Sequence, residues 1–177
     1  MSEYCMKCMS PLNGNTICPV CGFDTANNEV PADQLQPGTR LQNNRYIIGK
    51  ALGQGGFGIT YIARDTTLDT RIAVKEFFPH EYATRQQINS MMNSKVTLKD
   101  RKRSAVLLKG KEKFLQEARS LARFSEVPGI VRVRDFFEEN NTAYIVMEFL
   151  EGTDLRGRLK TELFQTDELF KLMEPIF

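Results

Sequence analysis

The four cysteines of this chain have the residue type and the spacing of a metal site. They form two pairs near the N-terminus, Cys5-x-x-Cys8 and Cys18-x-x-Cys21, with nine residues between the pairs. Two residues between cysteines allow one tight turn to direct both sulfurs at the same ion, and two such turns complete the tetrahedral four-sulfur shell that Zn²⁺ prefers. We therefore expect a structural zinc site. A pair of redox-active Cys-x-x-Cys motifs is the alternative.

This cysteine segment resembles a short zinc ribbon, which we expect over residues 1–24. A segment of this length cannot bury a stable core, so the metal would supply most of its folding free energy. Cysteine occupies all four metal positions, which leaves no position for a catalytic water. Zinc ribbons bind protein or nucleic acid. Because Lys7 is the only basic residue between Cys5 and Cys21, nucleic acid is not expected as a partner.

A second candidate site is the glycine-rich stretch LGQGGFGITYIA, from Leu52 to Ala63. Its glycines follow the pattern Gly53-x-Gly55-x-x-Gly58. This pattern can bind phosphate in two different architectures. In one, a strand turns into a helix that binds a dinucleotide, and in the other a β-hairpin folds over ATP.

The residues after the glycines decide between these two architectures. β-Branched and aromatic residues over 59–62 indicate a strand, a turn follows at 66–70, and residues 72–74 begin another strand. A dinucleotide-binding fold requires a helix directly after the glycines, because the first N–H groups of that helix contact the pyrophosphate. The sequence therefore predicts the β-hairpin, with Lys75 on the strand that follows it.

With Lys75 in the stretch IAVK, the chain resembles the N-terminal lobe of bacterial serine/threonine protein kinases of the eukaryotic type. The stretches GGFGITY and AVKEFFP carry this resemblance, which extends roughly over residues 45–177. It implies an α+β fold, with a five-stranded antiparallel sheet and one helix (αC), preceded by the zinc ribbon. It also implies that the cofactor is ATP and that the phosphate acceptors are Ser and Thr hydroxyls of a protein substrate.

The resemblance implies how phosphate would be bound. Backbone N–H groups of the loop would contact the phosphates, and the loop residues concerned are Leu52, Gly53, Gln54, Gly55, Gly56, Phe57 and Gly58. Lys75 would pair with the α- and β-phosphates and with a helical glutamate. Apolar residues recur at helical spacing over 111–124, and Glu117 lies in this stretch. Glu112 is the competing candidate, and a solvated carboxylate is the simpler interpretation of either.

An adenine pocket is implied as well. Met147 would lie behind the adenine, and backbone groups of Glu148 and Leu150 would bind its edge. Ala73 would line the pocket on the strand that carries Lys75. Thr60 stands where the family usually has valine, and its hydroxyl makes an otherwise apolar pocket more polar.

Two aspartates have competing interpretations. Asp154 falls where the family has an acidic residue near the ribose, but it is equally well placed to be the N-cap of a helix that starts at Leu155. Asp135 and Phe136 look like the start of a metal-binding Asp-Phe-Gly motif. They precede the adenine segment and Phe137 replaces the glycine, so we predict a strand there.

The order of these features gives the expected domains: a zinc ribbon at 1–24, a linker at 25–44, a kinase N-terminal lobe at 45–150 and the start of the C-terminal lobe at 151–177. The linker is inferred from Asn, Pro and Gly residues without periodicity. Because 41 residues separate Lys75 from Glu117, we expect an insertion at about 80–110. Its many basic residues favour a solvated loop, and a docking patch for an acidic partner or RNA is the alternative.

The catalytic half of a kinase is not expected in this chain. Phosphoryl transfer requires an aspartate that orients the acceptor hydroxyl, and an Asn and an Asp that hold Mg²⁺. The only histidine is His80, and 22 residues follow Leu155. We therefore expect a fragment, inactive in isolation, of a kinase that has its C-terminal lobe in cis and Mg²⁺ ligands beyond this chain. A catalytically inactive adaptor is the alternative.

The composition is typical of a globular protein, with 41% hydrophobic and 26% charged residues in 177. The net charge of +2 gives no reason to expect a nucleic acid or an anionic membrane as partner. No apolar run approaches the roughly 20 residues of a membrane span, and the N-terminus has no signal-peptide pattern. A cytoplasmic location is therefore expected, and a membrane anchor beyond residue 177 stays possible.

Overall fold

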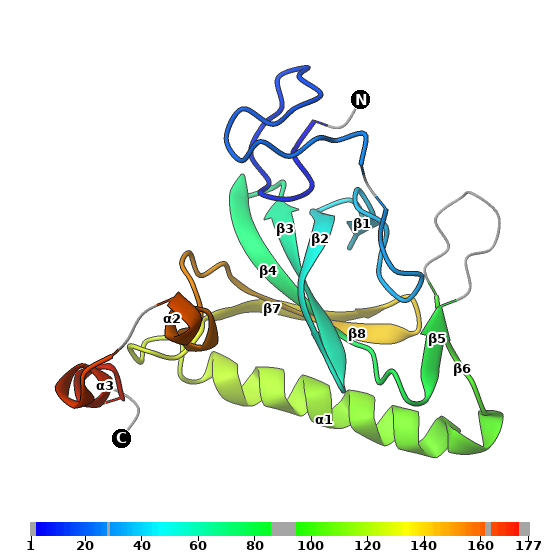
Figure 1. The fold of residues 1–177 in the computed structure, drawn as a ribbon. Coiled ribbons are helices and arrows are strands. Elements are labelled where there is room, and N and C mark those ends of the chain that lie inside the picture. The colour runs from blue at the N-terminus through cyan, green and yellow to red at the C-terminus, as the bar shows by residue number, and fades with distance from the viewer. Residues whose placement is uncertain (1–2, 28, 86–94, 162–163, 174–177) are drawn as a thin grey trace.

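The computed structural model describes residues 3–27, 29–85, 95–161 and 164–173. Its centre is a six-stranded antiparallel sheet (Figure 1). In their order across the sheet, the strands are β1 (Arg40–Leu41), β2 (Tyr46–Gly55), β3 (Gly58–Asp65), β4 (Thr70–Phe77), β8 (Thr142–Glu148) and β7 (Val133–Glu139). The five long strands confirm the predicted sheet, and the two-residue strand β1 adds a short sixth strand at one edge.

The helices lie outside this sheet. The long helix α1 (Ser104–Ala122) crosses below the sheet, and the N-terminal cysteine segment lies at the other end of the molecule, beside β3 and β4 (Figure 1). Two short helices, α2 (Leu155–Thr161) and α3 (Thr166–Met173), follow the last strand. Among the described residues, no helix is both long enough and apolar enough to cross a membrane.

The two faces of the sheet carry separate cores, because side chains alternate between the faces along each strand. On the face that meets α1, Phe77 and Ile145 pack with Leu115 and Ala118 of the helix. Lys75 shares this face, since it lies two residues before Phe77 on β4. The opposite face buries a larger cluster, which includes Tyr46, Ile48, Ile59, Tyr61, Ile72, Val74, Phe78, Tyr144 and Val146.

A buried ion pair lies within this larger core. The carboxylate of Glu76, which is fully buried, accepts two hydrogen bonds of 2.7 Å from Nη2 of Arg85. The hydroxyls of Tyr61 and Tyr144 donate to the same carboxylate at 3.0 and 3.1 Å. The Tyr61 oxygen also accepts a hydrogen bond from the N–H of Leu35. The network therefore ties the segment before β1 and the strand that carries Arg85 to the back of β4.

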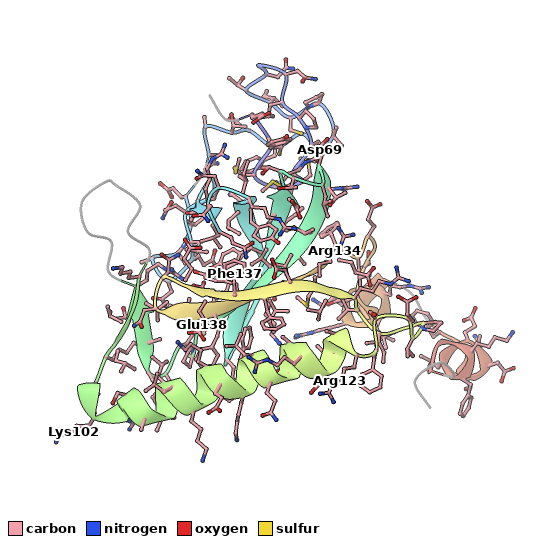
Figure 2. The ribbon with its side chains drawn as sticks, turned by 180° about the vertical axis from the view of Figure 1, so that it is seen from behind. Asp69, Lys102, Arg123, Arg134, Phe137 and Glu138 are labelled. Atoms are coloured by element: carbon pink, nitrogen blue, oxygen red, sulfur yellow. The ribbon has the colours of Figure 1, made fainter. Side chains whose placement is uncertain are left out.

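We expect Arg85→Met to destabilise the protein by about 3–5 kcal/mol, because it leaves the Glu76 carboxylate buried without its cation. The double variant Arg85→Met/Glu76→Met should recover part of this loss. Lys111→Met is the matched control, because Lys111 of α1 pairs with the half-exposed Glu138 of β7. Figure 2 labels Glu138 on its strand. This substitution should cost less than about 1 kcal/mol. Urea unfolding measures all three. An Arg85 variant as stable as the control would contradict the expectation.

The predicted insertion at about 80–110 contains more regular structure than expected. A small antiparallel pair, β5 (Ala83–Arg85) and β6 (Val96–Leu98), precedes a short 3-10 turn (Arg101–Arg103). Helix α1 then starts at Ser104, seven residues before the predicted start at 111. Its first turns are exposed except at Leu107, and the basic residues Arg101–Arg103 directly precede them, so the segment resembled a solvated loop. Residues 86–94 of the predicted insertion lie outside the described part of the chain.

Turn chemistry explains two of the sheet's connections. Asn140 and Asn141 join β7 to β8 with φ angles of 52° and 60°, as expected of a tight hairpin turn with two left-handed residues. Asp69 has a φ of 50° in the turn between β3 and β4. Asp135 and Phe136 lie within β7, which confirms the predicted strand.

Candidate functional site

The glycine-rich stretch forms the predicted hairpin. Strand β2 ends at Gly55, β3 begins at Gly58, and these two residues are paired across the turn. A Cβ atom added at Gly53, Gly55 or Gly56 would have no described atom within 4 Å, whereas one at Gly58 would overlap the backbone carbonyl oxygen of Glu76. Among these four glycines of the stretch, the fold therefore requires glycine only at Gly58. The glycines at the tip of the loop leave open space.

Lys75 and Glu117 meet beside this loop. The Nζ atom of Lys75 lies 3.3 Å from Oε1 of Glu117 on α1, and the side chains are 35% and 53% exposed. The ammonium also lies 5.5 Å from the centre of the Phe114 ring. Lys75 is paired with Thr60 across β3 and β4, which places it next to the loop. The structure thus brings together the lysine and the helical glutamate that the sequence suggested, and Glu112 does not take part in this ion pair.

A cavity of about 660 Å³ lies between the glycine loop and α1. Of the residues singled out from the sequence, those that line it are Gly53, Gln54, Gly55, Gly56, Phe57, Gly58, Thr60, Lys75 and Glu117. The sequence did not single out the remaining lining residues, which are Phe77, Gly110, Lys113 and Phe114. The signal for Phe77 was its period-two spacing from Lys75. Gly110 was missed because it precedes the predicted start of α1, and the place of Lys113 and Phe114 in the lining depends on how α1 lies against the loop.

Of the residues expected around adenine, Thr60 lines this cavity, whereas Ala73, Met147, Glu148 and Leu150 lie outside its lining. Ala73 and Met147 are direct neighbours across β4 and β8, so they occupy one patch of the sheet. Leu52 and Leu150 are 50% and 67% exposed. Glu148 pairs with the segment before β7, because its carboxylate accepts a hydrogen bond from the N–H of Arg132 at 2.8 Å.

Asp154 acts as the cap of α2. Its Oδ1 atom accepts a hydrogen bond of 2.6 Å from the N–H of Gly157, and its carbonyl oxygen accepts one from Arg158. The N-cap interpretation is therefore the one that the structure supports directly.

Gln54 makes contacts that the sequence gave no reason to expect. Its side-chain oxygen accepts a hydrogen bond of 3.0 Å from Gln34, and its amide nitrogen lies 3.2 Å from Nδ1 of His80. His80 is in turn 3.8 Å from Asp33. The segment before β1 thus contacts Gln54 of the glycine loop.

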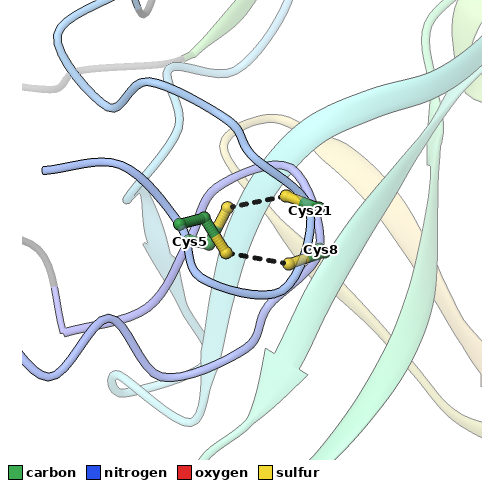
Figure 3. A group of neighbouring side chains, drawn as sticks. Cys5, Cys8 and Cys21 are labelled. Atoms are coloured by element: carbon green, nitrogen blue, oxygen red, sulfur yellow. Dashed lines mark hydrogen bonds between the residues drawn. The ribbon is translucent and has the colours of Figure 1, made fainter. Parts of the chain in front are cut away.

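The four cysteines form a second site, shown in Figure 3. The sulfur atoms of Cys5 and Cys21 are 3.6 Å apart, those of Cys8 and Cys18 are 3.7 Å apart, and all four lie within 4.8 Å of one another. A tetrahedral Zn²⁺ with bonds of about 2.3 Å requires sulfurs about 3.8 Å apart. The four side chains therefore fit this ion.

The two cysteine pairs sit on equivalent turns. The carbonyl oxygen of Cys5 accepts a hydrogen bond from the N–H of Met9 at 2.8 Å, and that of Cys18 accepts one from Gly22 at 2.9 Å. Met9 and Gly22 have φ angles of 57° and 68°, so each turn ends in a left-handed residue. Glycine is the residue type that adopts this conformation most readily, whereas the residue type of Met9 gives no such indication.

The geometry of the sheet, loop and ion pair agrees with a comparison by sequence. Residues 46–177, more than half of the chain, match the protein kinase domain. This chain belongs to the protein kinase family. The match begins at the first residue of β2, so residues 1–45 lie outside the matched range.

Similar kinases come from plants and bacteria. Calcium-dependent protein kinase 4 of Arabidopsis thaliana is 27% identical over 156 residues, which are 87% of this chain and 26% of the relative. Serine/threonine-protein kinase B of Synechocystis sp. is 29% identical over 163 residues, 89% of this chain and 22% of the relative. The chain thus spans about a quarter of the length of these relatives.

A solved kinase structure supports the same fold. The structure titled "PpkA-294 apo form" is 36% identical in sequence to this kinase and has a TM-score of 0.64. It is matched over 77% of this chain and 44% of its own length. Both the family and the fold that the sequence suggested, an N-terminal lobe of a bacterial-type serine/threonine kinase, are therefore confirmed.

Proposed function

We propose that this chain is the ATP-binding part of a protein serine/threonine kinase, which transfers the γ-phosphoryl group of ATP to Ser or Thr hydroxyls of a protein. The observation that carries the proposal is the ion pair of Lys75 and Glu117, whose Nζ and Oε1 atoms are 3.3 Å apart. This pair lines the same cavity as the glycine loop. An exposed pair of this kind contributes at most about 1 kcal/mol to stability. A role toward a ligand explains its position better.

Each residue would act on ATP in a simple way. Backbone N–H groups of the loop would bind phosphate oxygens, and the space at Gly53, Gly55 and Gly56 allows the phosphates to come close. Lys75 would bind the α- and β-phosphates while Glu117 keeps its ammonium in place. Mg²⁺, which the family uses to neutralise charge on the transferred phosphoryl group, would be held by residues beyond this chain.

The adenine would lie against the patch next to this cavity. Thr60, Ala73 and Met147 would cover its rings, and backbone groups of Glu148 and Leu150 would bind its edge. Asp154 would approach the ribose only with the oxygen atom that does not cap α2.

Phosphoryl transfer by the complete kinase, with its C-terminal lobe, tests the proposal. Purified kinase, γ-labelled ATP, Mg²⁺ and a Ser/Thr-rich acceptor protein should give labelled phosphoserine or phosphothreonine, while residues 1–177 in isolation should give none. Saturable ATP binding without any transfer by the complete kinase would point to a catalytically inactive adaptor. Absence of ATP binding to the complete kinase would exclude the proposed function.

Two glycine variants separate ligand binding from folding. Gly55→Ala should leave the free energy of unfolding within about 1 kcal/mol of wild type, because its new methyl group meets open space. It should nevertheless weaken ATP binding, since that methyl group enters the phosphate position. Gly58→Ala should cost about 1–3 kcal/mol of stability, because its methyl group overlaps the Glu76 carbonyl. Calorimetry with and without ATP measures both, and equal ATP affinity of Gly55→Ala and wild type would contradict the phosphate-binding role.

A structural Zn²⁺ is the second part of the proposed function. The four thiolates would hold the ion, and each would have to lose its proton. Burial raises the pKa of Cys5 to about 12, so the bound cation would have to compensate for the desolvation of that sulfur. The ion would supply the folding free energy that so short a segment lacks.

A further inference from the structure

The cysteine segment is docked on the kinase lobe through two methionines. Met6 and Met9 are buried and form one apolar cluster with Ile47 of β2 and Ile62 of β3. Burial of these apolar side chains against the lobe removes them from water, which stabilises the docked arrangement. The cysteine segment and the kinase lobe therefore share a packed interface within one chain.

Backbone and charged groups add specific contacts to this interface. The N–H of Lys50 donates to the carbonyl oxygen of Met6 at 2.7 Å, and Nη1 of Arg64 donates to that of Met9 at 3.2 Å. The guanidinium of Arg64 also lies 4.9 Å from the centre of the Tyr4 ring. Residue 49 has to be glycine here, because a Cβ atom would overlap the Met6 carbonyl and the end of Met9. These contacts define one docked position.

The same interface reaches the segment that follows β8. Phe149, which lies between Glu148 and Leu150, packs against the methionine cluster. The guanidinium of Arg71 lies 5.6 Å from the Phe149 ring and is ion-paired with Glu151. The ring is thus held between the cluster and Arg71. Its two neighbours are the residues to which the proposed function assigns the binding of the adenine edge.

The methionines belong to the first cysteine turn. Met6 lies between Cys5 and Cys8, and the N–H of Met9 closes the turn on the Cys5 carbonyl oxygen. A tetrahedral ion at the sulfurs would fix this turn, and loss of the ion would release it. The side chains that support Phe149 would be released together with the turn.

From these contacts we propose that the docked cysteine segment holds the adenine-binding segment 148–150 in place, so that zinc binding strengthens nucleotide binding, with Phe149 as the positioning residue. This inference rests on the proposed function of the kinase lobe and of the cysteine site. The two sites are coupled through one contiguous set of contacts, from Cys5 through Met6 and Met9 to Phe149.

The test compares wild type, Met6→Ala/Met9→Ala and the control Val20→Ala in the complete kinase, each with zinc and after removal of zinc by a chelator. Val20 is 70% exposed in the second cysteine turn, so the control changes the cysteine segment away from the interface. The readouts are the affinity for a fluorescent ATP analogue, amide hydrogen exchange of residues 147–151 and zinc content.

Zinc removal should weaken nucleotide binding by wild type and by Val20→Ala by about five- to tenfold and should speed exchange in residues 147–151. The methionine variant should keep its zinc, bind nucleotide as weakly as zinc-free wild type, and respond little to the chelator. Gly49→Ala, which blocks the interface from the kinase side, should behave like the methionine variant.

The outcomes separate this inference from the proposed function. Zinc-loaded methionine and Gly49 variants with wild-type nucleotide affinity and wild-type exchange would overturn the inference and leave both proposed sites standing. Zinc-loaded wild type that binds no nucleotide would overturn the proposed kinase function. Hydrogen exchange would then decide whether the cysteine segment still holds residues 148–150.

Discussion

Replacing Lys75 by methionine in the complete kinase should reduce phosphoryl transfer by about 100- to 1000-fold. Methionine has a similar length and apolar stem to lysine but lacks the positive charge that Lys75 places in the cavity. The phosphates would then lose a cation that is already in place, since Glu117 holds the Lys75 ammonium at 3.3 Å. Steady-state transfer of γ-labelled phosphate, with nucleotide affinity measured separately, gives the two quantities needed.

Two further variants show whether this effect depends on position. Lys109→Met removes a lysine from an exposed position of α1 and should leave transfer within about twofold of wild type, because surface substitutions away from a site have small effects. Glu117→Gln keeps the shape of the side chain, removes the partner charge of Lys75 and should give an intermediate loss. A Lys75→Met enzyme with the rate of Lys109→Met would remove the basis for the proposed role of the ion pair.

The Lys75 site could be predicted from the sequence because patterns between near neighbours in the chain indicate the strand, the loop and the helix that form it. The alternation of side chains along a strand places Lys75 on one face, and the glycine spacing followed by β-branched residues predicts a hairpin next to it. Helical periodicity places Glu117 on the same side as the buried residues of α1. The pairing of Lys75 with Glu117 was expected from the resemblance to the kinase family, because local rules alone do not say how α1 lies across the sheet.

Long-range contacts account for most of what the sequence left open. Glu76 follows Lys75 on the strand, so alternation alone directs it into the core, but its partner Arg85 could be identified only in the folded chain. In the sequence, Met6 and Met9 are simply residues beside the cysteines. They are buried because they pack against Ile47 and Ile62, which are distant in the chain. Charge misled the prediction just before α1, where the basic residues Arg101–Arg103 suggested that the loop continues.

Replacing Cys18 by serine should abolish zinc binding and unfold the cysteine segment. Burial acts to raise the pKa of Cys18, but the backbone N–H groups of Cys21 and Val20 outweigh it and lower that pKa to about 7. Cys18 is therefore well suited to bind the ion as a thiolate, whereas a serine hydroxyl does not ionise near neutral pH. Structural zinc contributes about 10–16 kcal/mol in small zinc-dependent folds, far more than the small core around Leu12 and Phe23 can replace.

Metal analysis of the purified protein should find about one zinc per chain in wild type and none in Cys18→Ser. Ile17→Ala is the control, because Ile17 is next to Cys18 and 60% exposed, and it should retain the metal. Limited proteolysis should cut the serine variant within residues 3–24 and spare the kinase sheet, whose two cores contain no cysteine. If the metal-free variant kept residues 3–24 resistant to proteases, the turns would be stable without an ion, and the four cysteines would need a different explanation.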